Sequence, residues 1–568
     1  MKNFLTLLYR AMTDKQNIPI LVILIFAFLI RIIGINFGLP LWIVPDEPAI
    51  IYAPLKMIEL KSIIPALHFD AFVGKFYYMP FIAYLYIIPL IFTLGIKFLL
   101  FSGTVAEFKN ILQLDLSAFF ITVRVINALI GVATVYVVYK ISENIFKNKR
   151  TALLSATFLS LSLLHIIFSH WTRHWVVSTF VVSLVLYVLT HPVWSKENRY
   201  LLAATICGVG IGMMLEISIL TFLLVIWFFL YDKLSIIKEI KQKWTWFSVA
   251  IFFSIFILAS LIWPKGPYLL QTNDNSIFTM QNIIHSFKNG YIFYFFDILK
   301  RETTFLIFFF VGAVIGFKKM RKYFLPIIIS VLLYTFLLYS VFNNLSRMIL
   351  FIYPFLAITA GYGLSEFLNV FGERKIVAYI VMVLVFLPLF ANVVLFDYLL
   401  IKNDTRTQAL EWVNQNVTAK SKILVLARYM RLPSTQESIE EQEKIDATSL
   451  RTVEQVERNL DDKFFTTKRF NALNLYAVVS STFYADLRDY IRAKKYEYII
   501  FDDNLVKIKG IDFSFAELGI PLKEYQGETV TDYNDPLDGA NLNVWRMLFL
   551  SNFGPSIKIY KVNIPNSK

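Results

Sequence analysis

Long apolar runs, separated by short basic loops, fill the first 396 of the 568 residues and restrict what this chain can fold into. A run such as residues 18–37 is long enough to cross the hydrocarbon core of a bilayer as a helix. The composition agrees, because 57% of the residues are hydrophobic and only 17% are charged. The sequence therefore predicts a polytopic α-helical membrane protein.

Basic residues gather in the short loops and predict the orientation of the chain. The clusters at 140–150, 232–243 and 318–322 are expected in the cytoplasm, together with the N-terminus. About eleven crossings satisfy these clusters if segment 79–101 is a juxtamembrane or re-entrant helix of a first external loop, residues 38–118. A true span at 79–101 is the alternative.

The short basic loops also explain most of the net charge of +14, so no nucleic acid partner is expected.

The composition changes abruptly near Asp397. The remaining residues are charged and polar, and the helix-like TRTQALEWVNQN is followed by the strand-like KILVLA. The same order returns in YADLRDYIRAKKYEYIIFDDN. We therefore expect a membrane domain, residues 1–396, and a soluble extracytoplasmic α/β domain, residues 397–568. The single cysteine, Cys207, lies in an apolar run and excludes an intramolecular disulfide.

Two acidic residues directly beyond the first span mark the stretch 31–80 as a candidate site. Gly38-Leu39-Pro40 ends the span, and Asp46 and Glu47 follow between two prolines. Desolvating a carboxylate near hydrocarbon costs several kcal/mol, so such a pair requires a reason. One alternative is that Asp46 only N-caps a helix that starts at Glu47. Four other residues of this stretch are expected to support the site: Arg31, His68, Asp70 and Tyr78.

The run RIIGINFGLPLWIVPDEPAIIYAPLKM resembles the first loop of the polyprenyl-phosphate-sugar-dependent glycosyltransferases of the GT-C superfamily. Its nearest likeness is to the group of protein O-mannosyltransferases and aminoarabinose transferases, in which an arginine, a Gly-Leu-Pro and an Asp-Glu follow one another. The segments NNLSRMILFIYPFLAITAGYG and DTRTQALEWVNQNVTAKSKILVL resemble family segments as well. The resemblance implies a multi-pass enzyme of the cell membrane. It would move a sugar from a polyprenyl-phosphate donor to an acceptor hydroxyl (protein, lipid or envelope glycan) on the extracytoplasmic face.

The chemistry of this transfer, together with the resemblance, suggests roles for individual residues. The lipid phosphate is the leaving group, so one carboxylate near the acceptor suffices as the base of an inverting displacement, and Asp46, with Glu47 beside it, fits that role. Arg347 is expected to bind the donor phosphate, because a guanidinium donates paired hydrogen bonds to phosphate. The alternative for Arg347 is a snorkelling interfacial side chain. Lesser candidates for the phosphate are Lys75, His174 and His285.

Two positions depart from the family pattern. In the external turn SHWTRHW, Trp175 occupies the place where an aspartate often closes the motif, and in GIGMMLEIS, Glu216 stands where a lysine is common. These departures leave a non-catalytic envelope-binding relative open as an alternative. A transporter or flippase is another, although no clear internal repeat is found. No Cys or His spacing indicates a metal site, so no cofactor is expected, while a role for a divalent metal stays open.

Overall fold

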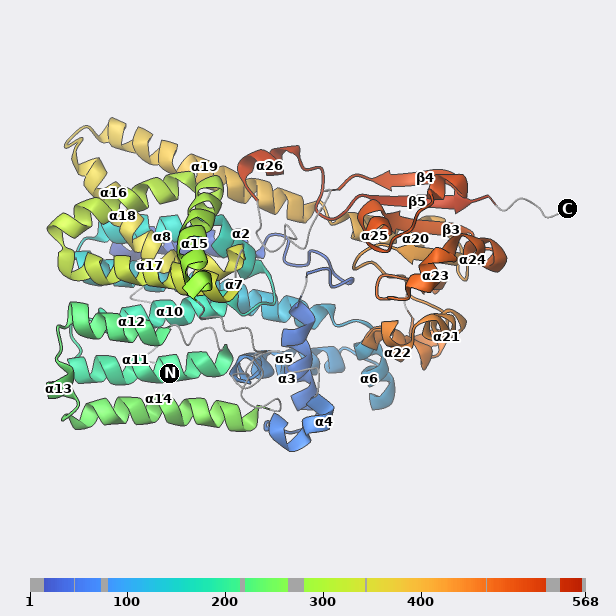
Figure 1. Ribbon diagram of the computed structural model, residues 1–568, viewed down its shortest axis with the longest axis horizontal. Coiled ribbons are helices and arrows are strands. Elements are labelled where there is room, and N and C mark those ends of the chain that lie inside the picture. The colour runs from blue at the N-terminus through green and yellow to red at the C-terminus, as the bar shows by residue number, and fades with distance from the viewer. Residues whose placement is uncertain are drawn as a thin grey trace.

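The computed structural model describes residues 15–44, 46–72, 80–214, 220–263, 280–342, 345–465, 467–527 and 542–563. A body of helices carries a five-stranded sheet with its own helices at one end (Figure 1). The longer helices of the body are α2 (Ile18–Ile32), α5 (Phe81–Leu99), α7 (Ser117–Phe146), α8 (Lys149–Ser160), α9 (Leu163–His170), α10 (Trp175–Leu189), α11 (Lys196–Met213), α12 (Leu220–Ile226), α14 (Lys243–Ile262), α15 (Met280–Arg301), α16 (Thr303–Lys319), α17 (Arg321–Phe342), α18 (Tyr353–Asn369) and α19 (Lys375–Ile401).

The remaining elements before residue 402 connect these helices and build much of the first loop. They are the 3-10 helices η1 (Lys15–Asn17), η2 (Pro65–His68) and η6 (Ser346–Ile352), the π-helix η4 (Trp227–Tyr231), and the helices α3 (Glu47–Leu60), α4 (Phe69–Phe72), α6 (Val105–Leu114) and α13 (Ile236–Glu239). In α6, Thr104 and Glu107 form a capping box, as the sequence TVAE favours. The first loop is therefore largely helical in its described parts.

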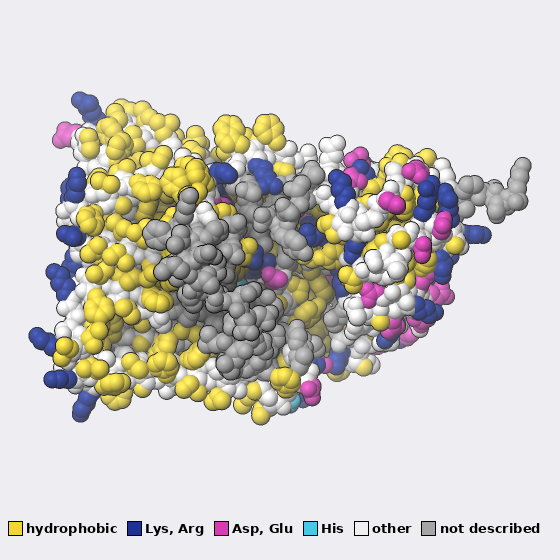
Figure 2. Space-filling model, in the orientation of Figure 1, with side chains coloured by type: hydrophobic (Ala, Val, Ile, Leu, Met, Phe, Trp, Pro, Cys, Tyr) yellow, Lys and Arg dark blue, Asp and Glu magenta, His cyan; other side chains and the backbone are white. Residues whose placement is uncertain are grey.

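Apolar side chains cover the helical body, and basic side chains gather at its edge opposite the sheet (Figure 2). Among the described residues, six helices are long and apolar enough to cross a membrane, and α8 together with α9 would make a seventh. The prediction of a helical membrane protein is thus confirmed. Helix α5 is one of the six, so its length and composition suit a full span as well as a re-entrant helix. The count of eleven crossings stays a prediction.

Cysteine labelling distinguishes the two topologies of α5. In a Cys207→Ser background, single cysteines at Ser102, beyond the end of α5, and at Asn148, beyond the end of α7, are placed on opposite sides by the expected topology. We expect a membrane-impermeant maleimide to label Ser102→Cys from outside intact cells and Asn148→Cys only after permeabilisation. The reverse pattern, with Asn148→Cys labelled from outside and Ser102→Cys only after permeabilisation, would mean that α5 crosses the membrane fully.

The apolar run 151–168 is not one straight helix, because it is broken between α8 and α9, which are bent by 58°. Ser162 caps the second piece by accepting a hydrogen bond from the His165 amide at 3.4 Å. Glu302, at the head of α16, accepts from the Ser162 hydroxyl at 2.9 Å and from the Leu164 amide at 3.2 Å. The break therefore keeps its backbone donors satisfied through a carboxylate that is distant in sequence.

The sheet lies in the C-terminal part of the chain and has the order β2-β1-β3-β5-β4. β2, β1 and β3 are parallel, whereas β5 is antiparallel to both β3 and β4. Buried aliphatic residues fill the strands β1 and β3, as expected for strands covered on both faces. The elements of this part are α20 (Thr405–Asn416), β1 (Lys422–Leu426), α21 (Gln436–Ile445), η7 (Ala447–Ser449), α22 (Thr452–Arg458), η8 (Asp462–Phe464), β2 (Asn471–Asn474), α23 (Ser481–Ala485), α24 (Leu487–Lys494), β3 (Tyr498–Asp502), α25 (Asp503–Ile508), η9 (Phe515–Glu517), β4 (Gly519–Tyr525), α26 (Val544–Phe549) and β5 (Ile557–Val562).

The C-terminal part packs against the first loop and against α19. Helices α22 and α6 lie side by side (Figure 1), and Lys463 forms an ion pair with Glu107 at 3.8 Å. On the other side α26 packs on α19, and the ring of Phe553 contacts those of Phe37 and Phe396, with centroids 5.8 and 5.9 Å apart. The sheet is thereby held above the loop that carries the acidic pair.

Candidate functional site

Asp46 stands at the head of α3 with a left-handed backbone, φ 63°. Aspartate tolerates this conformation better than most residues, but it is uncommon and often marks a functional position. Asp46 occupies the N-cap position, yet its side chain makes no capping hydrogen bond, so capping does not explain it. The carboxylate is 50% exposed and accepts a hydrogen bond from Nη2 of Arg173 at 3.2 Å. Asp46 is therefore accessible to a substrate and held in place by a buried arginine.

Glu47, the second acid of the predicted catalytic pair, is fully buried. Its two carboxylate oxygens accept hydrogen bonds from Arg124 at 2.9 and 2.5 Å, and one of them also accepts from the Thr172 amide at 2.6 Å. A carboxylate enclosed in this way cannot reach an acceptor. The structure thus places Glu47 as the anchor of the loop and leaves Asp46 as the acid that faces outward.

Arg124, on α7, connects Glu47 to the segment that precedes it. Its Nη1 donates to the carbonyls of Ile35 and Phe37, both at 2.8 Å, and its guanidinium lies 5.3 Å from the centre of the Trp171 ring. Gly34 and Gly38 adopt positive φ, 73° and 75°, in the tight turns of this segment, which L-residues rarely do. The turns and the buried guanidinium together fix the loop in front of α3.

The turn between α9 and α10 joins the acids to the expected phosphate-binding residues. Asn127 of α7 holds this turn by donating to the carbonyls of Trp171 and Arg173 at 2.7 and 2.9 Å. The ring of His174 lies 4.0 Å from that of Trp175, and the guanidinium of Arg347, in η6, lies 5.7 Å from the Trp175 ring. Arg173 and Arg347 both act electrostatically on His174. The predicted residues Arg347 and His174 are therefore brought together, next to the partner of Asp46.

The remaining predicted site residues lie elsewhere. Arg31 is buried and donates to the Ser160 carbonyl at 3.3 Å and to Nδ1 of His165 at 2.9 Å, while Arg124 and Arg173 are the arginines that pair with the acids. His68 and Asp70 lie beyond the far end of α3, which at 14 residues is about 20 Å long. Lys75, Tyr78, His285 and Glu216 fall outside the residues whose side chains the structure describes.

Two arginines of this site were not among the residues selected from the sequence. Arg124 lies inside the apolar run 119–139, and an ionisable residue in a membrane span indicates a function by default, so a signal was present. Arg173 belongs to the turn SHWTRHW, which also holds Trp175 in place of the family's aspartate. The basic residue that the turn does contain supplies the partner of Asp46.

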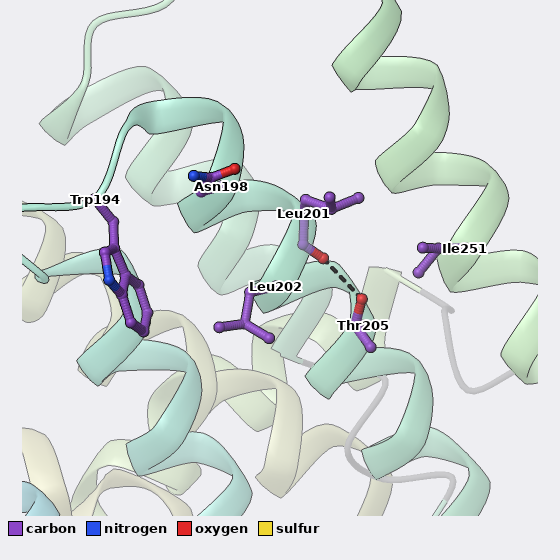
Figure 3. A pocket seen from close by; sticks show the side chains of 6 residues that line it. All are labelled: Trp194, Asn198, Leu201, Leu202, Thr205 and Ile251. Atoms are coloured by element: carbon purple, nitrogen blue, oxygen red, sulfur yellow. Dashed lines mark hydrogen bonds between the residues drawn. The ribbon is translucent and has the colours of Figure 1, made fainter.

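A groove of about 340 Å³ lies between α11 and α14, apart from this site (Figure 3). Its lining holds no titratable side chain, and the Thr205 hydroxyl donates to the carbonyl of Leu201 at 2.9 Å within its own helix. The groove therefore offers no group for acid–base chemistry. The residues that line it are Trp194, Asn198, Leu201, Leu202, Thr205 and Ile251.

Residues 114–263 match the family model described as dolichyl-phosphate-mannose-protein mannosyltransferase. No curated protein matches the chain. Among solved structures, the Archaeoglobus fulgidus oligosaccharyltransferase is similar, with 13% identity, a TM-score of 0.46, and 84% of this chain and 68% of that chain covered. ArnT from Cupriavidus metallidurans, solved with undecaprenyl phosphate, has 11% identity, a TM-score of 0.45, and coverage of 96% and 99%. Both TM-scores are below 0.5, so we infer neither activity nor substrate from them.

Proposed function

We propose that this chain is a glycosyltransferase of the GT-C superfamily. It transfers a sugar from a polyprenyl-phosphate donor to an acceptor hydroxyl on the extracytoplasmic face, with Asp46 as the base. The family match over residues 114–263 supports the resemblance that the first loop suggests, and its description supports a polyprenyl-phosphate donor. The observation that carries the proposal is the Asp46 carboxylate, which is half-exposed, held by Arg173, and fixed at the head of α3 by the buried Glu47–Arg124 pair.

The chemistry is a single displacement at the anomeric carbon of the sugar. Asp46 takes the proton of the acceptor hydroxyl while the hydroxyl oxygen bonds to the anomeric carbon. At the same time the bond from that carbon to the phosphate oxygen breaks. The lipid phosphate leaves with the electron pair, and the configuration at the anomeric carbon inverts. The hydrogen bond from Arg173 orients the carboxylate, and Glu47 positions the loop without touching the acceptor.

The leaving phosphate is assigned to Arg347. Its guanidinium lies over Trp175, beside the turn that supplies the partner of Asp46, so the base and the leaving group would flank one sugar. Charge-assisted paired hydrogen bonds are about twice as strong as neutral ones, and they require the planar fork of arginine.

Replacement of Arg347 separates charge from hydrogen-bond geometry. We expect Arg347→Lys to weaken binding of a polyprenyl-phosphate sugar by roughly tenfold, and Arg347→Ala to weaken it further, because the first loses only the fork and the second also loses the charge. Equilibrium binding of a radiolabelled donor to purified protein in detergent measures both. Equal affinity in wild type and both variants would assign Arg347 to interfacial packing instead.

The proposed reaction is tested by incubating purified protein with radiolabelled polyprenyl-phosphate sugars and membrane extract. We expect the label to move from the lipid phosphate to an acceptor, and the inverted anomeric configuration to be found in the product. A transporter or flippase would move the intact donor between leaflets of a vesicle and leave the sugar–phosphate bond unbroken. Donor that stays intact with every sugar and extract tried would contradict the proposal.

A further inference from the structure

The parallel part of the C-terminal sheet has the geometry that α/β folds use for ligand binding. The chain passes from β1 to β2 on one side and then crosses back to β3 on the other side of β1. Right-handed crossovers in opposite directions leave a crevice at the carboxyl ends of β1 and β3, where such sheets bind ligands. Asp502 spans this crevice by accepting hydrogen bonds from the amides of Arg428 and Leu505 at 2.7 and 2.6 Å.

This carboxyl edge faces the helical body and the first loop. β5 runs away from the helical body, towards the end of the molecule where the C-terminus lies (Figure 1). β3 is antiparallel to β5 and therefore ends on the side that faces the helical body. Tyr52, on the helix that begins behind Asp46, lies close enough for Arg431 and Arg451 to act on it electrostatically. Burial raises the pKa of the Tyr52 hydroxyl to about 12, and the two guanidinium groups oppose that rise. This edge of the sheet and α3, the helix that begins behind Asp46, therefore lie close to each other.

Hydrogen-bond donors line this edge, and its one half-exposed carboxylate among the residues that follow β1, β2 and β3 directly, Asp503, pairs with Lys558 at 2.7 Å. The turn after β1 carries Arg428 and Tyr429, and Tyr429 has a left-handed backbone, φ 57°, which is uncommon for a bulky residue. Its ring lies 5.0 Å from that of Tyr476, which follows β2. The guanidinium of Arg451 lies 5.6 Å from the Tyr476 ring, so the aromatic pair has an arginine on each side.

The carboxylates next to these arginines are buried and already hydrogen-bonded within the protein. Glu457 is 2% exposed and binds Arg431 at 2.7 Å and the Ser434 amide at 3.3 Å. Glu454 is 1% exposed and accepts from the Arg451 amide at 2.8 Å and from the Asn474 side chain at 3.3 Å. The half-buried surface of the edge is thus formed by guanidinium and phenol groups, which donate hydrogen bonds, and these suit an oxyanion.

Resting on the proposed function, we infer that this edge binds an oxyanion, phosphate or carboxylate, carried by the acceptor, and so presents the acceptor hydroxyl to Asp46. The residues that form this acceptor subsite are Arg428, Tyr429, Arg431, Arg451, Tyr476 and Tyr52. An acceptor without a phosphate or carboxylate would lose these contacts and keep only its contacts near Asp46.

Protection of individual arginines from chemical modification tests the subsite, and this experiment does not require sugar transfer. Purified full-length protein in phosphatidylcholine nanodiscs is treated with phenylglyoxal, with and without inorganic phosphate or acetate, and modification is mapped by peptide mass spectrometry. We expect anion at about ten times its dissociation constant to slow modification of Arg428 about tenfold, since only the unoccupied subsite reacts. Arg492, an exposed arginine of α24, is the internal control and should react at an unchanged rate.

Nanodiscs that contain phosphatidylglycerol, without added phosphate, identify the source of the anion. Protection of Arg428 there shows that a lipid headgroup reaches the subsite, whereas protection by free phosphate alone assigns it to a soluble group. If Arg428 and Arg492 behave alike under every condition, no oxyanion binds at this edge and the inference is overturned. This result stands whether or not the protein transfers a sugar, so it does not depend on the transfer assay.

A second measurement connects the subsite to the acceptor. Arg428→Gln should raise the KM for the acceptor about tenfold and leave hydrolysis of the donor by water unchanged, because Arg428 lies on the sheet beside Tyr429, whereas the donor phosphate is assigned to Arg347 in η6. The matched variant Arg492→Gln should change neither quantity. An unchanged KM in Arg428→Gln would show that the edge does not bind the acceptor, even if donor turnover proceeds normally.

Discussion

Asp46→Asn should lower the rate of sugar transfer by about 10² to 10⁴, the contribution of a positioned general base. The substitution keeps the size of the side chain and its ability to accept from Arg173, so the loop and donor binding should change little. Single-turnover transfer with saturating radiolabelled donor measures the chemical step, and equilibrium binding of the same donor provides the comparison. Loss of rate with preserved donor affinity is the signature of a missing base.

Asp70→Asn is the matched control for this experiment. Asp70 is exposed in α4, in the same loop as Asp46 but beyond the far end of α3, so its replacement should leave transfer unchanged. If Asp46→Asn transfers sugar as fast as the wild-type protein, Asp46 is not the base. A comparable loss in both variants would instead show that the loop as a whole depends on its negative charge.

Glu47→Gln should cost about 3–5 kcal/mol of unfolding free energy, because it leaves the charge of Arg124 buried without a counter-ion. The effect is expected on folding of the loop rather than on the chemical step, since Glu47 is enclosed by Arg124 and the Thr172 amide. Unfolding in mixed micelles with increasing sodium dodecyl sulfate measures the difference from wild type.

Glu59→Gln, on the same helix, is the comparison for Glu47→Gln. Glu59 forms ion pairs with Lys56 and Lys109 at 2.9 and 3.0 Å, but its side chain is 42% exposed. Exposed pairs contribute about 1 kcal/mol or less, so this variant should be only slightly destabilised. Equal destabilisation of the two variants would mean that the buried pair does not hold the loop.

The sequence contained the fold class because periodicity and charge are local signals. Apolar runs, basic loops and the acids after the first span can each be read within a short window, as the region around Asp46 shows. The partners of these groups come from distant segments. Arg124 and Arg173 reach the acids from α7 and from the turn before α10, and no local pattern relates those positions.

The break between α8 and α9 illustrates the same limit. Read alone, 151–168 is a normal apolar run, although Ser162 lies within it. The break is stable because Glu302 accepts from Ser162 and Leu164, a contact between residues far apart in the chain. Likewise, the helix-then-strand order after Asp397 predicts α/β structure, but the crossing from β2 back to β3 exists only in three dimensions.

The connection between α19 and α20 determines how an acceptor can arrive. Only Lys402, Asn403 and Asp404 separate the two helices, and the Thr405 amide donates to the carbonyl of Phe553 at 3.0 Å. Gly554 passes so close to Asp404 that an added Cβ would lie 2.6 Å from its carboxylate. A three-residue junction that packs against Phe553 and Gly554 has little freedom, in contrast to a flexible linker. A short junction of this kind restrains the sheet relative to α19. If the proposed transfer takes place, we therefore expect the acceptor to reach Asp46 by diffusion rather than by a swing of the sheet, and we expect bulky acceptors to be poor substrates.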